Sequence, residues 1–216
     1  MFYLARMPWL LKKFYSSCIW KGKENAIYLT FDDGPHPEIT DFVLQQLLIF
    51  KAKASFFCIG KNVVAYPETY SNIIDNGHTI GNHTFSHLNG WKTKDSVYLE
   101  DIAEAKKYID SNYYRPPYGR ITPFQLKQLS APRFNLTCIM WSLLSADFDN
   151  SLSPERCLEK LLLTVRGGDI VVFHDSVKAD KNLQYVLPKF LEFCKEKGYL
   201  LQSIDSINES KKVGPE

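Results

Sequence analysis

The chain has 216 residues, of which 45% are hydrophobic and 23% charged, an ordinary balance for one soluble domain with a full core. The net charge is only +2, so neither a nucleic acid nor a strongly acidic partner is expected. The five cysteines are widely spaced and form no Cys-x-x-Cys pair, which argues against a disulfide framework and against a cysteine zinc site.

Residues 1–25 are apolar and aromatic, but Arg6, Pro8 and two lysines interrupt them. A secretory signal needs an unbroken apolar stretch of about 7–15 residues, and a transmembrane helix needs about 20. Neither is visible, so we expect no transmembrane segment and a cytoplasmic or membrane-peripheral location. We expect this segment to pack on the domain, since a membrane-surface anchor would need a broader amphipathic helix. Nothing in the pattern indicates an oligomeric state.

Beyond this segment, short β-rich runs alternate with helical patterns. The predicted strands are 26–31, 54–60, 78–84, 113–119, 136–142, 169–175 and 199–203. The predicted helices are 37–52, 67–77, 94–112, 122–130, 153–165 and 182–198, and Ser153 and Pro154 form a good N-cap and first helical position for one of them. About seven strands alternating with helices predict an α/β fold with a parallel sheet. A barrel and an open doubly wound sheet both fit this pattern.

Titratable side chains follow these predicted strands. The first strand is followed by Asp32 and Asp33, and the later ones lead to segment 83–87, to segment 115–119, to Asp147 and to the pair His174 and Asp175. In both architectures the carboxyl ends of the strands carry the chemistry. The sequence therefore predicts an active site at this edge of the sheet.

His83 and His87 are four residues apart, so one helical turn between them would place both imidazoles on one face. An aspartate would complete a three-ligand metal set that leaves one position open for water. Two histidines at this spacing can equally be ordinary core or surface residues. The aspartate pair at a neighbouring strand end favours the metal site.

Asp32 and Asp33 are adjacent carboxylates, which repel each other unless their charges are compensated. Two adjacent charged carboxylates are tolerable if one binds a divalent metal and the other is held by a guanidinium. The carboxylate that does not bind metal then stays free as a base. A surface turn would explain Gly34 and Pro35, but it would not explain the apolar strand that leads into them.

Five segments resemble, in order and spacing, the five motifs of the polysaccharide deacetylases, also called the NodB-homology domain or carbohydrate esterase family four. They are residues 30–35, 83–87, 115–119, 146–148 and 171–175. The resemblance runs from about residue 26 to about residue 203. It implies a distorted, TIM-barrel-like (β/α) barrel of about seven parallel strands. We accordingly predict a catalytic domain over 26–207, between the N-terminal segment 1–25 and a flexible tail at 208–216.

The resemblance also implies an activity: hydrolysis of an acetyl group from an acetylated oligo- or polysaccharide, most often the N-acetyl of an N-acetylglucosamine unit. It implies a divalent metal, usually zinc and sometimes cobalt or nickel. By the same resemblance, Asp32 would be the general base held by Arg115, and His174 would be the general acid paired with Asp147. The metal ligands would be Asp33, His83 and His87. The backbone N–H of Tyr118 would bind the oxyanion, and Val172 would line the acetyl pocket.

The fourth motif departs from the family pattern, Asp-x-x-Asp-Trp. Leu144 replaces the first aspartate and Phe148 replaces the tryptophan that walls the sugar groove. Neither change touches the metal or the acid–base pair, and both concern the identity of the sugar. An O-acetyl esterase, for example on acetylated xylan, would use the same site. A non-catalytic sugar-binding relative usually lacks a ligand or the base, and no such residue is missing here.

Overall fold

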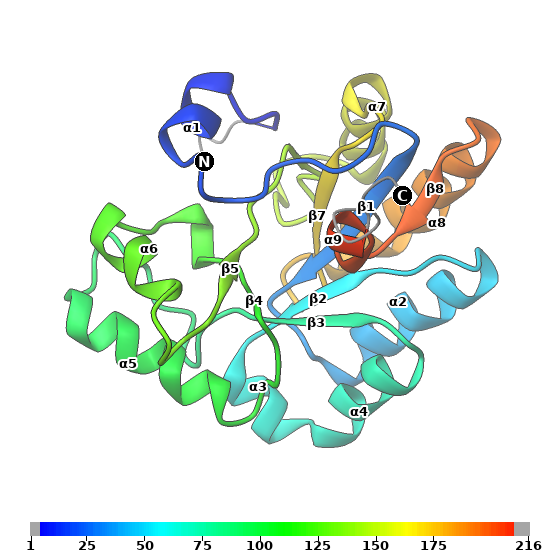
Figure 1. Cartoon of the computed structure of the whole chain (residues 1–216). Coiled ribbons are helices and arrows are strands. Elements are labelled where there is room, and N and C mark those ends of the chain that lie inside the picture. The colour runs from blue at the N-terminus through cyan, green and yellow to red at the C-terminus, as the bar shows by residue number, and fades with distance from the viewer. Residues whose placement is uncertain (1–4, 210–216) are drawn as a thin grey trace, which may run out of the picture.

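The computed structural model describes residues 5–209, and its eight strands form one sheet with parallel neighbours. Figure 1 shows the sheet curling into an open, distorted barrel. The strand order β5-β4-β3-β2-β1-β7-β6, with β8 paired to β1, confirms the predicted barrel of parallel strands over the open sheet. The strands are β1 (Ala26–Asp32), β2 (Ser55–Cys58), β3 (Thr79–Asn82), β4 (Tyr113–Tyr114), β5 (Thr137–Cys138), β6 (Leu143–Leu144), β7 (Ile170–His174) and β8 (Leu200–Gln202).

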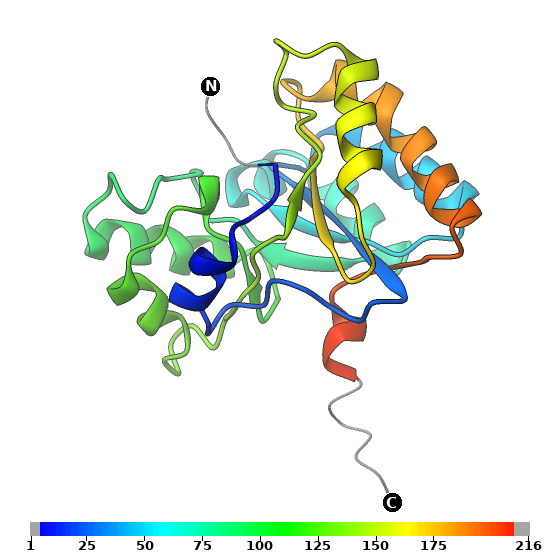
Figure 2. The same cartoon turned by 90° about the horizontal axis from the view of Figure 1, so that it is seen from above.

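Helices surround the curled sheet (Figures 1 and 2). They are α1 (Trp9–Phe14), α2 (Pro37–Ile49), α3 (Gly60–Ala65), α4 (Pro67–Asp75), α5 (Asp95–Lys106), α6 (Pro123–Leu129), α7 (Pro154–Thr164), α8 (Asp180–Glu196) and α9 (Asp205–Glu209). The sequence pattern did not predict α1, α3 or α9, because each has only five or six residues and hardly completes the period of an amphipathic helix. Helix α9 extends two residues into the predicted tail, and residues 210–216 lie outside the described residues.

Local chemistry explains why several elements begin where they do. All seven positions of β1 are buried, as expected of a parallel strand covered on both faces. The Ser153 hydroxyl accepts a hydrogen bond from the Arg156 N–H at 3.4 Å, and Pro154 opens α7, so the predicted cap is confirmed.

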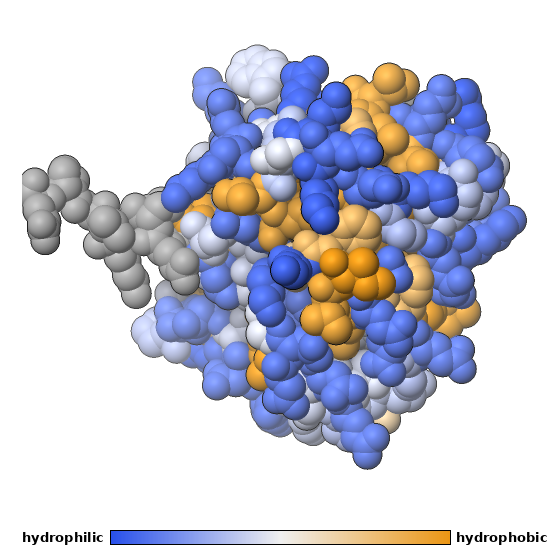
Figure 3. All heavy atoms as spheres, turned by 90° about the vertical axis from the view of Figure 1, so that its right-hand side faces the viewer, coloured by the Kyte–Doolittle hydropathy of each residue, from blue (hydrophilic) through white to orange (hydrophobic). Residues whose placement is uncertain are grey.

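The α2 and α8 side of the molecule, seen in Figure 3, is mostly hydrophilic with smaller hydrophobic areas.

Two predicted strands are much shorter than expected. The strand predicted over 113–119 ends at Tyr114, because Pro116 and Pro117 have no N–H to donate to a ladder. The strand predicted over 136–142 is confined to β5, and a separate strand, β6, follows it. The chain therefore turns away from β4 and crosses to β7 within a few residues, and this crossing leaves an open seam between the two ends of the sheet.

The N-terminal segment lies across this seam (Figure 2). Near β5, the Ile19 N–H donates to the Cys138 carbonyl at 2.9 Å. Near β6, the Leu144 N–H donates to the Ala5 carbonyl at 2.8 Å. Arg6 forms an ion pair of 2.7 Å with Asp169, whose side chain is fully buried. Residues 5–25 thus pack on the barrel, whereas the domain boundaries stay predictions. Among residues 5–209, no helix is both long and apolar enough to cross a membrane.

Candidate active site

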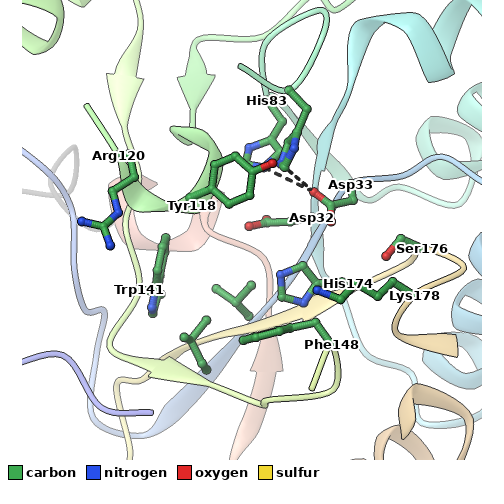
Figure 4. Close-up of a pocket in the computed structure, with 13 residues that line it drawn as sticks. Asp32, Asp33, His83, Tyr118, Arg120, Trp141, Phe148, His174, Ser176 and Lys178 are labelled. Atoms are coloured by element: carbon green, nitrogen blue, oxygen red, sulfur yellow. Dashed lines mark ion pairs between the residues drawn. The ribbon is translucent and has the colours of Figure 1, made fainter. Parts of the chain in front are cut away.

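The strand register brings the predicted site residues to one edge of the barrel. Asp32 is the last residue of β1 and is paired in register with His174, the last residue of β7. Arg115 directly follows β4, and His83 directly follows β3. Figure 4 shows the side chains of Asp32, His83 and His174 converging on one pocket. The structure therefore brings together residues that are up to 142 positions apart in the chain.

Asp32 is held by a buried arginine. The Nη1 atom of Arg115 donates to Asp32 Oδ1 at 2.7 Å, and the two side chains are 0% and 6% exposed. The guanidinium also donates to the Thr30 hydroxyl and to the carbonyls of Ile139 and Met140. Its Cζ atom lies 4.0 Å from the centre of the Phe57 ring. These contacts fix the guanidinium, so one oxygen of Asp32 is anchored by a permanent positive charge.

Asp33, His83 and His87 form a separate cluster. Asp33 Oδ1 lies 3.6 Å from His83 Nε2 and 3.1 Å from His87 Nε2, and one ligand atom from each residue lies within 4.8 Å of the others. Burial alone would raise the pKa of Asp33. The hydrogen bond from His87 and the nearby imidazole charges outweigh that effect and hold this pKa well below its usual range.

The donor set fits a divalent metal. His83 Nδ1 lies 2.8 Å from the Arg115 carbonyl, so this nitrogen carries the proton and Nε2 keeps its lone pair toward Asp33. Burial lowers the pKa of His83 to about 4, which keeps the imidazole neutral at pH 7. Two imidazole nitrogens and one carboxylate oxygen are the ligands of a site that keeps an open position.

The helical turn that would have placed both histidines on one face does not form. Residues 83–87 form a non-helical loop in which Thr84 and His87 have φ angles of 65° and 57°. The Asp101 carboxylate holds this loop by accepting the N–H groups of Phe85 and Ser86, each at 2.9 Å. The two imidazoles still meet, with ring centres 5.1 Å apart, because the loop reverses direction rather than advancing along a helix.

His174 is oriented by Asp147. Asp147 Oδ1 lies 2.8 Å from His174 Nδ1, and Oδ2 accepts the His174 backbone N–H at 2.7 Å. The carboxylate thus fixes both the backbone and the ring, and leaves Nε2 as the free ring nitrogen. Burial alone would lower the pKa of His174. The charge and hydrogen bond of Asp147 outweigh this and raise the pKa to about 9, so the imidazole is protonated at pH 7.

Asp175, the neighbour of His174, supports the loop that follows Asp33. Its Oδ1 accepts the Gly34 N–H at 3.1 Å, and its Oδ2 accepts the Thr40 hydroxyl at 2.5 Å. Burial raises the pKa of Asp175 to about 8. A side chain placed on Gly34 would meet this carboxylate at 2.1 Å. The glycine is therefore required for close approach of the loop to Asp175, a reason that the turn chemistry of the sequence does not reveal.

The pocket around these residues has a volume of about 230 Å³. Of the predicted substrate residues, Val172, Phe148 and Tyr118 line it, and the Tyr118 ring lies 4.6 Å from the His87 ring. Four further lining residues were not predicted from the sequence, namely Arg120, Trp141, Ser176 and Lys178. Arg120, Ser176 and Lys178 each lie within three residues after a motif, which is their sequence signal, whereas Trp141 lies between β5 and β6 and has no such signal.

Backbone strain concentrates at the same edge. Within residues 5–209, seven non-glycine residues have positive φ angles, and five of them lie in the loops of the site: Asp33, Thr84, His87, Tyr118 and Ala146. Left-handed conformations are costly for such residues and persist where the surrounding structure enforces them. This concentration is independent support for a functional role of these loops.

Comparison with known proteins agrees with this geometry. The sequence profile of the family described as polysaccharide deacetylase matches residues 21–131. A peptidoglycan-N-acetylglucosamine deacetylase of Bacillus cereus is 31% identical over 191 residues, which cover 86% of this chain and 89% of the relative. The chain therefore belongs to the polysaccharide deacetylase family.

Two further relatives bear on the site. A chitooligosaccharide deacetylase of Azorhizobium caulinodans is 31% identical over 165 residues, which cover 73% of this chain and 77% of the relative. The crystal structure of a peptidoglycan N-acetylglucosamine deacetylase in complex with a naphthalenyl-N-hydroxybenzamide superimposes with a TM-score of 0.84 at 27% identity. That match covers 93% of this chain and 96% of the solved one.

Proposed function

We propose that this chain is a metal-dependent hydrolase that removes acetyl groups from a carbohydrate, with an N-acetylglucosamine-type unit as the substrate. The observation that carries the proposal is the convergence of a held carboxylate, an Asp-His-His cluster and a protonated histidine on one pocket. The similarity to deacetylases of peptidoglycan and of chitooligosaccharides supports the N-acetyl substrate.

Asp33, His83 and His87 would hold the metal, and zinc suits their nitrogen and oxygen donors best, with cobalt or nickel as possible replacements. A divalent metal at this cluster supplies Lewis acidity, which polarises a carbonyl oxygen and lowers the pKa of water. The neutral imidazole of His83 and the ionised carboxylate of Asp33 are the protonation states that such ligation requires.

Asp32 is proposed as the general base. Its carboxylate lies next to the metal cluster but is anchored by Arg115 at 2.7 Å, so it is held in place to accept a proton from the attacking water. The same ion pair engages one of its two oxygens, which favours a role for Asp32 separate from that of the cluster. The backbone N–H of Tyr118 is proposed to stabilise the oxyanion of the tetrahedral state.

His174 is proposed as the general acid. Its raised pKa keeps a proton on Nε2, and Asp147 aims this nitrogen at the pocket. An amine is a poor leaving group unless it is protonated, so the imidazolium would donate its proton to the leaving nitrogen as the bond to the acetyl carbon breaks. Acetate and the free amino sugar are the products.

The proposal is tested by acetate release from N-acetylglucosamine oligomers, alongside O-acetylated xylan, in the presence of a chelator and after zinc or cobalt is restored. We expect release from the oligomers that is lost with the chelator and returns with metal. Release from acetylated xylan alone would reassign the activity to an O-acetyl esterase. The absence of release from both substrates by metal-loaded protein would contradict the proposal.

A further inference from the structure

A second cavity of about 300 Å³ adjoins the active-site pocket. The two share Tyr118, Arg120, Trp141 and Leu144 as lining residues. We call the second one the extension cavity; its remaining lining residues are Met7, Leu11, Tyr15, Trp20, Trp91, Gly119 and Met140. Four of these come from residues 7–20, which precede the part of the chain that the family profile matches. The extension cavity is therefore built in part by a segment outside the family match.

Away from the residues that it shares with the active-site pocket, the extension cavity presents mainly hydrocarbon. Three of its aromatic residues have their polar atoms bonded within the protein: the Tyr15 hydroxyl and the Trp91 indole N–H both donate to the Ile121 carbonyl, at 3.1 and 3.0 Å. The Trp20 indole N–H donates to the Tyr15 carbonyl at 2.9 Å. A sugar has hydroxyl groups that need partners when they are buried. The lining therefore fits an alkyl or isoprenoid chain better than a second sugar.

Arg120 lies at the junction of the two cavities (Figure 4). Its guanidinium is stacked 4.0 Å from the Trp91 ring centre, and it forms no ion pair with a carboxylate of the described chain. Trp141, which also lines both cavities, has an indole N–H without a partner in residues 5–209. The indole N–H is enclosed by protein, whereas the Arg120 guanidinium is exposed and lacks a carboxylate partner among the residues that the structure describes, and such a guanidinium is the chemistry that recognises a phosphate.

The surface beside the extension cavity is both apolar and basic. Leu11 of α1 lines the cavity, whereas Trp9, Leu10 and Phe14 of the same helix are 68%, 62% and 75% exposed. The last turn of the helix also carries Lys12 and Lys13. Exposed tryptophan, leucine and phenylalanine together with lysine favour the interface of an anionic bilayer.

We propose that the substrate is an acetylated sugar joined through a phosphate to a lipid chain and taken from a membrane surface. This inference rests on the proposed deacetylase activity. The sugar would occupy the active-site pocket and the phosphate would contact Arg120. The first part of the lipid chain would enter the extension cavity. Hydrolysis is unchanged: water adds to the acetyl carbon, the bond to nitrogen breaks, and acetate leaves while the phosphate bond stays intact.

The test compares acetate release from four compounds with the same N-acetylglucosamine unit. They are a prenyl-phosphate-linked sugar in mixed micelles, an octyl glycoside, the free sugar 1-phosphate and a soluble oligomer. We expect kcat/KM for the prenyl-phosphate sugar to exceed the others by at least about tenfold, since both the phosphate and the chain gain contacts. We also expect Arg120→Gln to remove most of that advantage, whereas Lys195→Gln on α8 should leave it unchanged.

Membrane binding is measured separately, by co-sedimentation with phosphatidylglycerol vesicles. Leu10→Ser should weaken binding severalfold, and the matched control Leu48→Ser, which changes a similarly exposed leucine on α2, should not. Release from the soluble oligomer as fast as from the prenyl-phosphate sugar would overturn this inference and leave the deacetylase proposal standing. Release from none of the four compounds would refute both.

Discussion

Asp32 and Asp33 are consecutive in the chain, yet their carboxylates have different partners. Asp32 Oδ1 lies 2.7 Å from Arg115 Nη1, whereas Asp33 Oδ1 lies 3.1 Å from His87 Nε2. The separation arises because β1 ends at Asp32 and Asp33 then adopts a φ of 78°. The backbone turn replaces the strict alternation of a strand. It thus allows adjacent carboxylates to reach one pocket while a guanidinium holds only the first of them.

The raised pKa of His174 predicts the alkaline limit of activity. A general acid works only while it is protonated, so activity should fall as the pH rises through about 9. Asp147→Asn removes the charge that raises this pKa and should move the alkaline limb toward about 6.5, the ordinary value for histidine. The measurement is the pH profile of kcat/KM. Asp149→Asn, a nearby change of the same kind, should leave the limb in place, and an unmoved limb in Asp147→Asn would argue against His174 as the acid.

The ligand cluster predicts one divalent metal for each chain. His87→Ala removes one of three ligands and should lower metal affinity by at least about tenfold, an effect typical of changes at or near a metal site. Metal content after dialysis, measured by mass spectrometry, reports this directly. His36→Ala changes a histidine outside the cluster and should retain the metal. Equal metal content in both variants would place the ion elsewhere.

The N-terminal segment should contribute to stability. Arg6 pairs with Asp169, whose buried carboxylate also accepts the Ser142 hydroxyl and the Arg166 N–H. Arg6→Ala leaves this carboxylate without its closest cation and should lower the free energy of unfolding by about 2 kcal/mol. Denaturant unfolding measures the difference.

Arg133→Ala breaks an exposed ion pair with Glu100 and serves as the control, with an expected change below about 1 kcal/mol. Equal losses of unfolding free energy in the two variants would show that the Arg6–Asp169 contact stabilises the fold no more than an exposed ion pair does. A loss confined to Arg6→Ala would show that the segment is part of the folded barrel.

Much of the active site could be predicted from the sequence, because parallel strands bring their carboxyl ends to one edge. The positions of Asp32, His83 and His174 follow from that rule once the strands are identified. The spacing of His83 and His87 was misleading, because a four-residue interval suggests a helical turn and residues 83–87 form a loop instead. The decisive contact is that of Asp101 with the loop backbone, and no local pattern reveals it.

The contacts of Arg115 and of the N-terminal segment could not be predicted in this way. Arg115 is fixed partly by the carbonyls of Ile139 and Met140, and backbone acceptors carry no side-chain signal. The pairing of Ala5 with Leu144 is also a backbone contact. Such contacts depend on where the barrel is left open, and this follows from the short strands β4 to β6 rather than from residue type.

The most direct test of the account is to compare Asp32→Asn with Asp33→Asn, measuring both metal content and acetate release. The account predicts that Asp32→Asn retains one divalent metal for each chain and loses activity by about 10²–10⁴-fold, the range expected for removal of a general base. It predicts that Asp33→Asn loses the metal as well as activity. Turnover that survives in metal-loaded Asp32→Asn, or metal loss in that variant equal to the loss in Asp33→Asn, would contradict the division of roles between the two carboxylates.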